Sequence, residues 1–154
     1  MHRESVSLNE AARVIEAAKR HAEEMSVAMN VAVVDAGCNL VAFIRMDDAW
    51  LGSIDIAQKK AFTARAFNVS THELATLAAP GQPLYGLANT NDGQVVIFGG
   101  GMPLKRGERI VGAVGVSGGK PDQDHAVAAA GAAASARRPR RRTRNLVTRG
   151  WHFG

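Results

Sequence analysis

The chain has little cysteine and no long apolar run. Cys38 is the single cysteine among 154 residues, which excludes an intrachain disulfide and fits a reducing compartment. No stretch approaches the roughly 18 consecutive apolar residues that a membrane-spanning helix needs. The N-terminal MHRESVSLNEAARVIEAAKRH lacks the apolar core of a secretory signal. These absences favour a cytoplasmic protein with no membrane partner.

Common metal and phosphate motifs are also missing. No HxxxH or HExxH spacing relates the five histidines, so a structural zinc site is not expected; they are His2, His21, His72, His125 and His152. Neither GxxxxGK[ST] nor a GxGxxG that opens a parallel βαβ unit is present, which argues against a nucleotide-binding loop. The segment GVSGG at 115–119 matches the GxSxG elbow of hydrolases only loosely, and we do not favour a hydrolase.

Acidic residues are absent after Asp124, so the charge is uneven. The net charge of +5 includes seven arginines between Arg137 and Arg149, whereas 12 other basic and 14 acidic residues leave 1–136 at −2. The segment 137–154 lacks periodicity and an apolar face. We therefore expect one domain over 1–136 and a disordered, arginine-rich extension over 137–154.

This extension offers arginines for phosphates, with Trp151 and Phe153 available to stack on bases. No recognition module accompanies it. We favour an appended extension, for example one read in a shifted frame, over a nucleic-acid-binding arm, and we do not expect nucleic acid as a partner of the domain.

The remaining composition and patterning predict an α+β domain. Apolar residues make up 46% of the chain and charged residues 21%, as in an ordinary globular domain. A capping box at Ser7-Leu8-Asn9-Glu10 begins a helix. Further helices are expected at 53–68, 70–77 and from 121, and strands at 31–34, 40–44, 95–98, around Pro103 and at 110–117. Short connections between consecutive strands favour a mostly antiparallel sheet, with Pro103 at an edge or bulge.

The segment 99–131 is rich in glycine and organises the rest. In the strand 110–117 both faces carry apolar or small residues, which indicates a central strand covered on two sides. Its glycines, Gly112 and Gly115, indicate close approach by another backbone, a helix or a ligand, and we favour tight packing of a helix on the sheet.

The loop after this strand leads into a helix that begins near Pro121. Free amides in such a turn can hold a carboxylate or phosphate, with Lys120 adding positive charge. Asp122 and Asp124 support the other reading, in which acidic side chains cap the helix and repel an anion.

Five segments together resemble the GlcG/HbpS family, whose domain also occurs at the C-terminus of PduO-type corrinoid adenosyltransferases. They are VVDAGCNLVAFIRMDDAW, SIDIAQKKAFTARAF, GGGMP, GAVGVSGG and QDHAVAAAG, in this order within Ser7 to Ala134. The resemblance implies profilin-like α/β/α layers around a mostly antiparallel five-stranded sheet. Cys38 departs from the family pattern, which usually has a second glycine there.

The resemblance implies haem as the ligand, in a haem-binding module that degrades or senses haem. No CxxCH is present, so the haem would be held non-covalently. Haem needs an apolar slot, cations for its propionates and an axial ligand to iron. The candidates for propionates are Arg45, Lys59, Lys60 and Arg106, and the candidates for iron are His21 and His125. Ser117, Gly118 and Gly119 form the candidate anion cradle.

Two alternatives stay open. One is an accessory protein or enzyme that acts on a small organic acid or corrinoid in a catabolic pathway. The other is an oligomeric scaffold, which the resemblance implies because family members self-assemble. A scaffold of this kind is compatible with either ligand. We expect a homo-oligomer, a dimer or higher. A histidine at a helix end, such as His21, also has an ordinary structural role.

Overall fold

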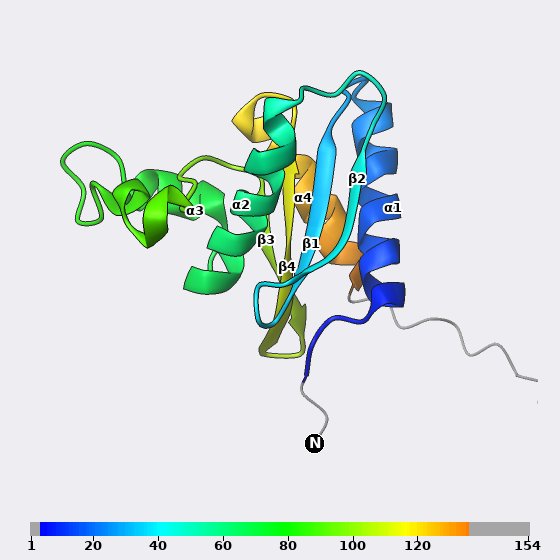
Figure 1. Ribbon diagram of the computed structural model, residues 1–154, viewed down its shortest axis with the longest axis horizontal. Coiled ribbons are helices and arrows are strands. Elements are labelled where there is room, and N and C mark those ends of the chain that lie inside the picture. The colour runs from blue at the N-terminus through cyan, green and yellow to red at the C-terminus, as the bar shows by residue number, and fades with distance from the viewer. Residues whose placement is uncertain (1–3, 136–154) are drawn as a thin grey trace, which may run out of the picture.

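The computed structural model describes residues 4–135. The expected extension 137–154 lies outside the described residues. Four α-helices, two short 3₁₀ turns and four strands follow one another (Figure 1). In chain order they are α1 (Leu8–Glu24), β1 (Asn30–Asp35), β2 (Leu40–Arg45), α2 (Gly52–Phe67), α3 (Thr71–Leu77), η1 (Leu87–Asn89), η2 (Asn91–Gly93), β3 (Gly101–Arg106), β4 (Arg109–Ser117) and α4 (Pro121–Ser135).

The sheet has the order β2-β1-β4-β3, and every neighbouring pair is antiparallel. The antiparallel α+β fold is as predicted, with four strands rather than five. Val95–Phe98 forms no strand. Val95 and Val96 are buried, and the Val96 N–H donates to the Thr63 hydroxyl of α2 at 3.0 Å. This apolar segment therefore contributes buried side chains without pairing in the sheet.

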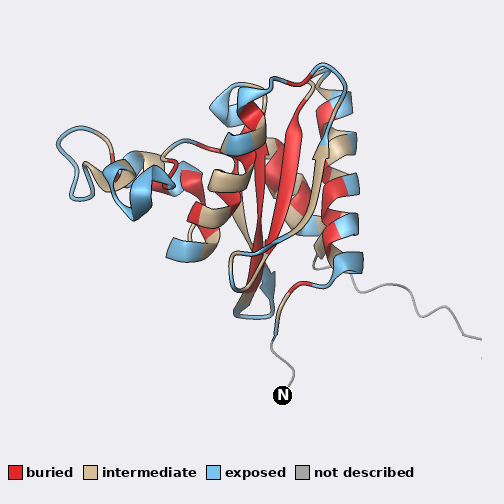
Figure 2. Cartoon of the chain, viewed as in Figure 1, coloured by how far each residue is buried: buried red, intermediate tan, exposed pale blue. Residues whose placement is uncertain are grey.

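Helices cover both faces of the sheet, in three layers. α2 packs on β1, β3 and β4 from one side, and α1 and α4 pack together on the other. Figure 2 shows that β1 and β4, the two inner strands, are buried along most of their length. Val31, Val33, Val114 and Val116 belong to the core on the α1 and α4 side.

Local signals predicted from the sequence are present. The Ser7 hydroxyl accepts the Glu10 N–H at 3.1 Å, and the Glu10 carboxylate accepts the Ser7 N–H at 3.2 Å, which completes the capping box of α1. Pro103 lies in β3, an edge strand, where its missing N–H costs least. The predicted central strand is β4, which lies between β1 and β3.

α2 approaches the sheet very closely at Gly115. A Cβ atom there would collide with the Ala57 carbonyl oxygen and would lie 2.5 Å from the Ala61 nitrogen. The tight packing of a helix on the sheet, predicted for this strand, is therefore confirmed at Gly115.

Residues 78–94, which we call the arm, carry η1 and η2 and project away from the layers (Figure 1). Tyr85, in this arm, is 71% exposed. Within 4–135 no helix combines the length and hydropathy required to cross a membrane.

Candidate functional site

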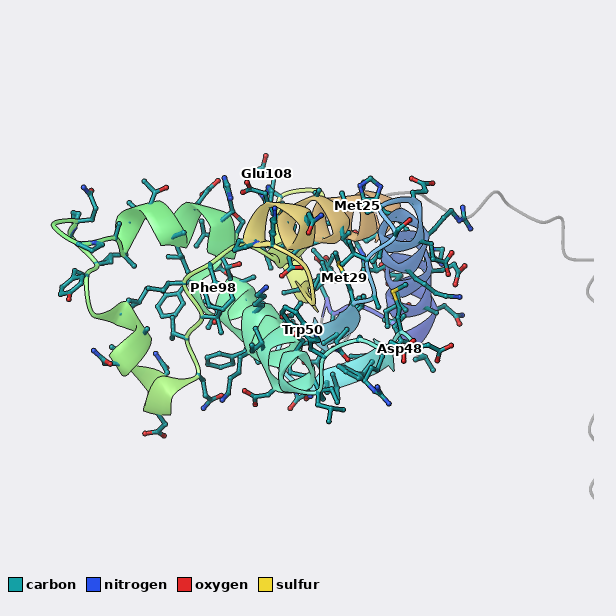
Figure 3. All side chains as sticks on the ribbon, turned by 90° about the horizontal axis from the view of Figure 1, so that it is seen from above. Met25, Met29, Asp48, Trp50, Phe98 and Glu108 are labelled. Carbon is teal, nitrogen blue, oxygen red and sulfur yellow. The ribbon has the colours of Figure 1, made fainter. Side chains whose placement is uncertain are left out.

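A buried ion pair joins α2 to α4. Lys60 Nζ and Asp124 Oδ2 lie 2.8 Å apart, and 0% and 4% of the two side chains are exposed. The same ammonium donates to the Val116 carbonyl oxygen at 2.9 Å. It also lies 4.9 Å from the centre of the Phe98 ring, which is found beside α2 in Figure 3. One lysine therefore connects α2, the end of β4 and the start of α4.

Burial disfavours the charged form of each member of this pair. Burial lowers the pKa of Lys60 and raises the pKa of Asp124, because both groups lose hydration of the charged form. The charge of the partner opposes each shift. Removing one member would leave an uncompensated buried charge, at a typical cost of about 3–5 kcal/mol.

The triple glycine of the sequence packs directly against this pair. A Cβ atom on Gly100 would lie 2.7 Å from Lys60 Nζ, and one on Gly101 would collide with the Lys60 carbonyl oxygen. A Cβ atom on Gly99 would lie 3.3 Å from the His125 Cβ. The segment therefore needs glycine because it wraps around a lysine and the first turn of a helix.

The loop that could have cradled an anion is filled by side chains of the protein itself. The Gly119 N–H donates to Asp124 Oδ1 at 2.8 Å, and the Lys120 N–H donates to Gln123 Oε1 at 2.9 Å. Ser117 is buried, and its hydroxyl lies 3.1 Å from that of Ser53. A Cβ atom on Gly118 would lie 2.5 Å from the Ala28 carbonyl oxygen. Acidic and amide side chains of α4 thus occupy the turn.

Two histidines meet between α3 and α4. The rings of His72 and His125 stack with centroids 4.4 Å apart and planes at 25°. The Nδ1 atom of His125 is buried and has no hydrogen-bond partner among residues 4–135. His72 lies next to Thr71, whose buried hydroxyl accepts the Gly101 N–H at 2.8 Å. The sequence predicted His125 as a site residue and assigned no site role to His72.

An open cleft of about 510 Å³ borders this imidazole pair. Its walls include the apolar side chains of Val69, Met102, Pro103 and Ala132, and Lys105 of β3 contributes a positive charge. Glu73 contributes a negative charge. The cleft therefore offers an imidazole, apolar contact and one cation within a single chain.

His125 favours the neutral form. Burial is the main cause that lowers its pKa below the ordinary value of 6.5, and the nearby His72 lowers it further, while Asp122 and Glu73 act in the opposite direction. A neutral imidazole keeps a nitrogen lone pair free, as metal ligation requires. These residues suit a haem with an axial histidine.

His21, the other predicted iron ligand, lies elsewhere. It belongs to the last turn of α1, where 37% of its side chain is exposed and Nδ1 is 3.6 Å from the Glu24 carboxylate. It borders a shallow pocket of about 170 Å³ with Ala130 and Ala133 of α4. Within residues 4–135, His21 and His125 border different pockets.

The predicted propionate partners are dispersed. Lys59 pairs with Asp55 at 2.9 Å, and Arg106 pairs with Glu10 at 2.6 Å. Arg45 borders a separate pocket of about 470 Å³ between α1 and β2, with Lys19 and Met46. None of these three cations lines the cleft beside His125.

Sequence reasoning missed three features of this region: the pairing of Lys60 with Asp124, the stacking of His72 on His125, and the position of Lys105 in the wall of the cleft. A signal existed for Lys60, since it lies on the inward stripe with Ala57, Ala61 and Ala64, where a lysine is rarely buried without a partner. No local signal identifies Asp124 as that partner, because the two residues are 64 positions apart.

Residues 6–133 match a protein family described as haem-degrading protein HbpS-like. An uncharacterised 15.0 kDa protein from the dhaT-dhaS intergenic region of Citrobacter freundii is 42% identical over 124 residues, which cover 80% of this chain and 87% of that protein. The corrinoid adenosyltransferase PduO of the same organism is also 42% identical over 124 residues, but these cover 37% of its length.

A solved structure, described as the PduOC:haem complex, superposes with a TM-score of 0.80 at 39% identity and covers 84% of this chain and 94% of that one. The similarity in sequence and the similarity in fold extend over the same domain, helices and sheet included. On both grounds, the chain belongs to the HbpS-like family.

Proposed function

We propose that this protein binds haem non-covalently in the cleft between α3, β3 and α4, with His125 as an axial ligand. The observation that carries the proposal is the neutral His125 imidazole at the wall of a partly apolar cleft. Its Nδ1 is buried, so Nε2 is the nitrogen proposed for iron. The similarity to a protein solved as a haem complex supports it.

In this proposal the side chains around His125 have separate tasks. Met102 and Pro103 supply apolar contact for the macrocycle, and the Lys105 ammonium pairs with a propionate. His72 supports one face of the His125 ring without occupying its in-plane nitrogen lone pairs. Bound haem would supply redox chemistry at iron. We include haem degradation in the proposal because the family is described by that activity.

His21 is the second candidate ligand. Its pocket of about 170 Å³ is too small for a macrocycle within one chain, so a haem there would need a second subunit. We propose a homo-oligomer on separate grounds, since the adjacent side chains of Trp50 and Leu51, just before α2, are 69% and 73% exposed and burial of large apolar side chains favours association. Light scattering on the purified protein tests this. We also propose a cytoplasmic location, because a single cysteine fits a reducing compartment.

Titration with haemin tests the proposed site. We expect a shifted Soret band that saturates at one haem per chain, and we expect His125→Ala to weaken binding at least about tenfold, or 1.4 kcal/mol, with an altered band position. His21→Ala is the matched control and should leave both unchanged. Weaker binding in His21→Ala, unchanged binding in His125→Ala and a stoichiometry of one haem per two chains would instead indicate a site at His21. A spectrum of free haemin throughout would contradict haem binding.

The corrinoid reading remains the alternative, since relatives bear the name corrinoid adenosyltransferase although the chain spans about a third of their length. Cobalamin titrated in the same way gives the comparison. Perturbed cobalamin bands together with a flat haemin titration would favour the alternative over haem.

A further inference from the structure

Each of the two stacked histidines directly follows a buried polar side chain. Thr71, which is 0% exposed, precedes His72, and Asp124, which is 3% exposed, precedes His125. Thr71 is bound to the Gly101 N–H, and Asp124 is bound to Lys60 and to the Gly119 N–H. Both anchors thus hold the backbone immediately beside an imidazole.

The contacts of Asp124 fix the first turn of α4 from two directions. On one side, Lys60 reaches from α2 and is itself held by the Val116 carbonyl oxygen at 2.9 Å. On the other side, the Gly119 amide donates to the remaining carboxylate oxygen at 2.8 Å. Since His125 is the next residue on the same turn, its Cβ position follows from this arrangement.

The glycine segment leaves this turn little room to shift. A Cβ atom added to Gly99 would already lie 3.3 Å from the His125 Cβ and 2.8 Å from the Pro121 carbonyl oxygen. A rotation of the turn toward Gly99 would therefore close this contact.

We propose that Lys60 is a positioning residue for His125. Through Asp124 it fixes the first turn of α4, so that the His125 imidazole stacks on His72 and borders the cleft. The inference rests on the proposed function only in treating His125 as a haem ligand. The positioning of the ring is a property of the chain without haem.

A purely stabilising role explains the pair less well. An apolar pair of similar volume usually stabilises a core as well as a buried ion pair or better. The ion pair also fixes the relative orientation of the elements that it joins, because the Lys60 ammonium donates to two fixed oxygens, one on β4 and one on α4. Such orientation matters where a side chain must be held at one place.

The test compares Lys60→Met and Asp124→Asn with the control Thr63→Val. Thr63 is equally buried on the same helix, and its hydroxyl binds the Val96 N–H at 3.0 Å rather than α4. The first readout is the NMR shift of the His125 and His72 ring protons in haem-free protein, at a pH where both rings are neutral. The second is the haem dissociation constant, measured well below the unfolding temperature of every variant.

We expect both pair variants to move the His125 resonances, through changed ring currents, and to weaken haem binding about tenfold, while Thr63→Val does neither. A folded Lys60→Met protein with unchanged resonances and unchanged affinity would overturn the proposal. Should Lys60→Met not fold, Asp124→Asn, which keeps the side-chain shape and one acceptor oxygen, gives the same comparison. Moved resonances in a protein that binds no haem would retain the positioning role and reject the haem proposal.

Discussion

Cys38 occupies a backbone conformation that suits glycine. At the tip of the hairpin between β1 and β2 its φ is 64°, in the left-handed region that costs a residue with a Cβ atom about 1–2 kcal/mol. This agrees with the glycine that the family pattern favours there. Burial raises the pKa of the thiol, the nearby Arg65 opposes the shift and Asp35 adds to it, so the cysteine is not activated as a nucleophile.

We expect Cys38→Gly to raise the free energy of unfolding by up to about 1 kcal/mol, because relief of the left-handed strain exceeds the entropy that glycine adds to the unfolded chain. Urea denaturation measures the change. Cys38→Ser is the control, since it removes the thiol and keeps the strain, and it should give no gain. A Cys38→Gly protein less stable than the parent would contradict this account.

Single residues also show where sequence reasoning stopped. The cap at Ser7 and the edge position of Pro103 follow from local chemistry, and both were predicted. The stacking of His72 on His125 and the burial of Lys60 depend on contacts between distant segments. A lone sequence reports periodicity within an element, but it does not report which elements meet.

At the scale of elements, α2 lies so close to the sheet that Gly115 has no room for a side chain. We expect Gly115→Ala to destabilise the fold by about 1–3 kcal/mol or more, because the added methyl group meets the backbone of α2. Gly52→Ala is the matched control: nothing lies within 4 Å of a Cβ atom there, and in the first turn of α2 alanine should add about 0.4–1 kcal/mol. Equal unfolding midpoints for the two variants would refute this packing.

The start of α1 carries a dependence on pH through Glu10. Burial raises its pKa, but hydrogen bonds from Arg106 and Ser7 and the charge of Arg106 outweigh this, so the pKa lies below 4.5. A carboxyl group with a lowered pKa in the folded state stabilises the fold above its unfolded pKa, and this contribution is lost as pH falls through the folded value.

We therefore expect Glu10→Gln to lower the free energy of unfolding by about 1–2 kcal/mol at pH 7 and to have a smaller effect at pH 3. Urea denaturation at both pH values measures this. Glu16→Gln is the control, because its ion pair with Arg20 is 3.9 Å long and exposed and contributes about 0–1 kcal/mol. An effect of Glu10→Gln that is equal at the two pH values would contradict the linkage.

Elements were predicted better than their pairing. The helices and the antiparallel hairpins follow from capping boxes, periodicity and short connections. The segment Val95–Phe98 was wrongly predicted as a strand because burial against α2 and pairing in a sheet select the same apolar residues. Local patterns do not predict the candidate site, because its cleft collects side chains from α3, β3 and α4.

At the scale of the whole molecule, the family match and the excess of positive charge occupy different parts of the chain. The family match ends at residue 133, and seven arginines follow from Arg137 onward. We expect deletion of residues 136–154 to leave haem affinity and the unfolding midpoint unchanged, and to abolish any salt-sensitive shift of DNA in gels. A loss of haem binding on deletion would show that the domain needs this segment.

The ammonium group of Lys60 touches parts of the chain that are far apart in sequence: the carbonyl of Val116, the carboxylate of Asp124, the ring of Phe98 and the space that Gly100 leaves open. Substitutions at Lys60, Asp124 and Gly100 therefore depend on one another. Replacing only the lysine or only its carboxylate should therefore cost more stability than replacing both together by apolar residues. Any lineage that lost this lysine would have had to change its partners in the same interval.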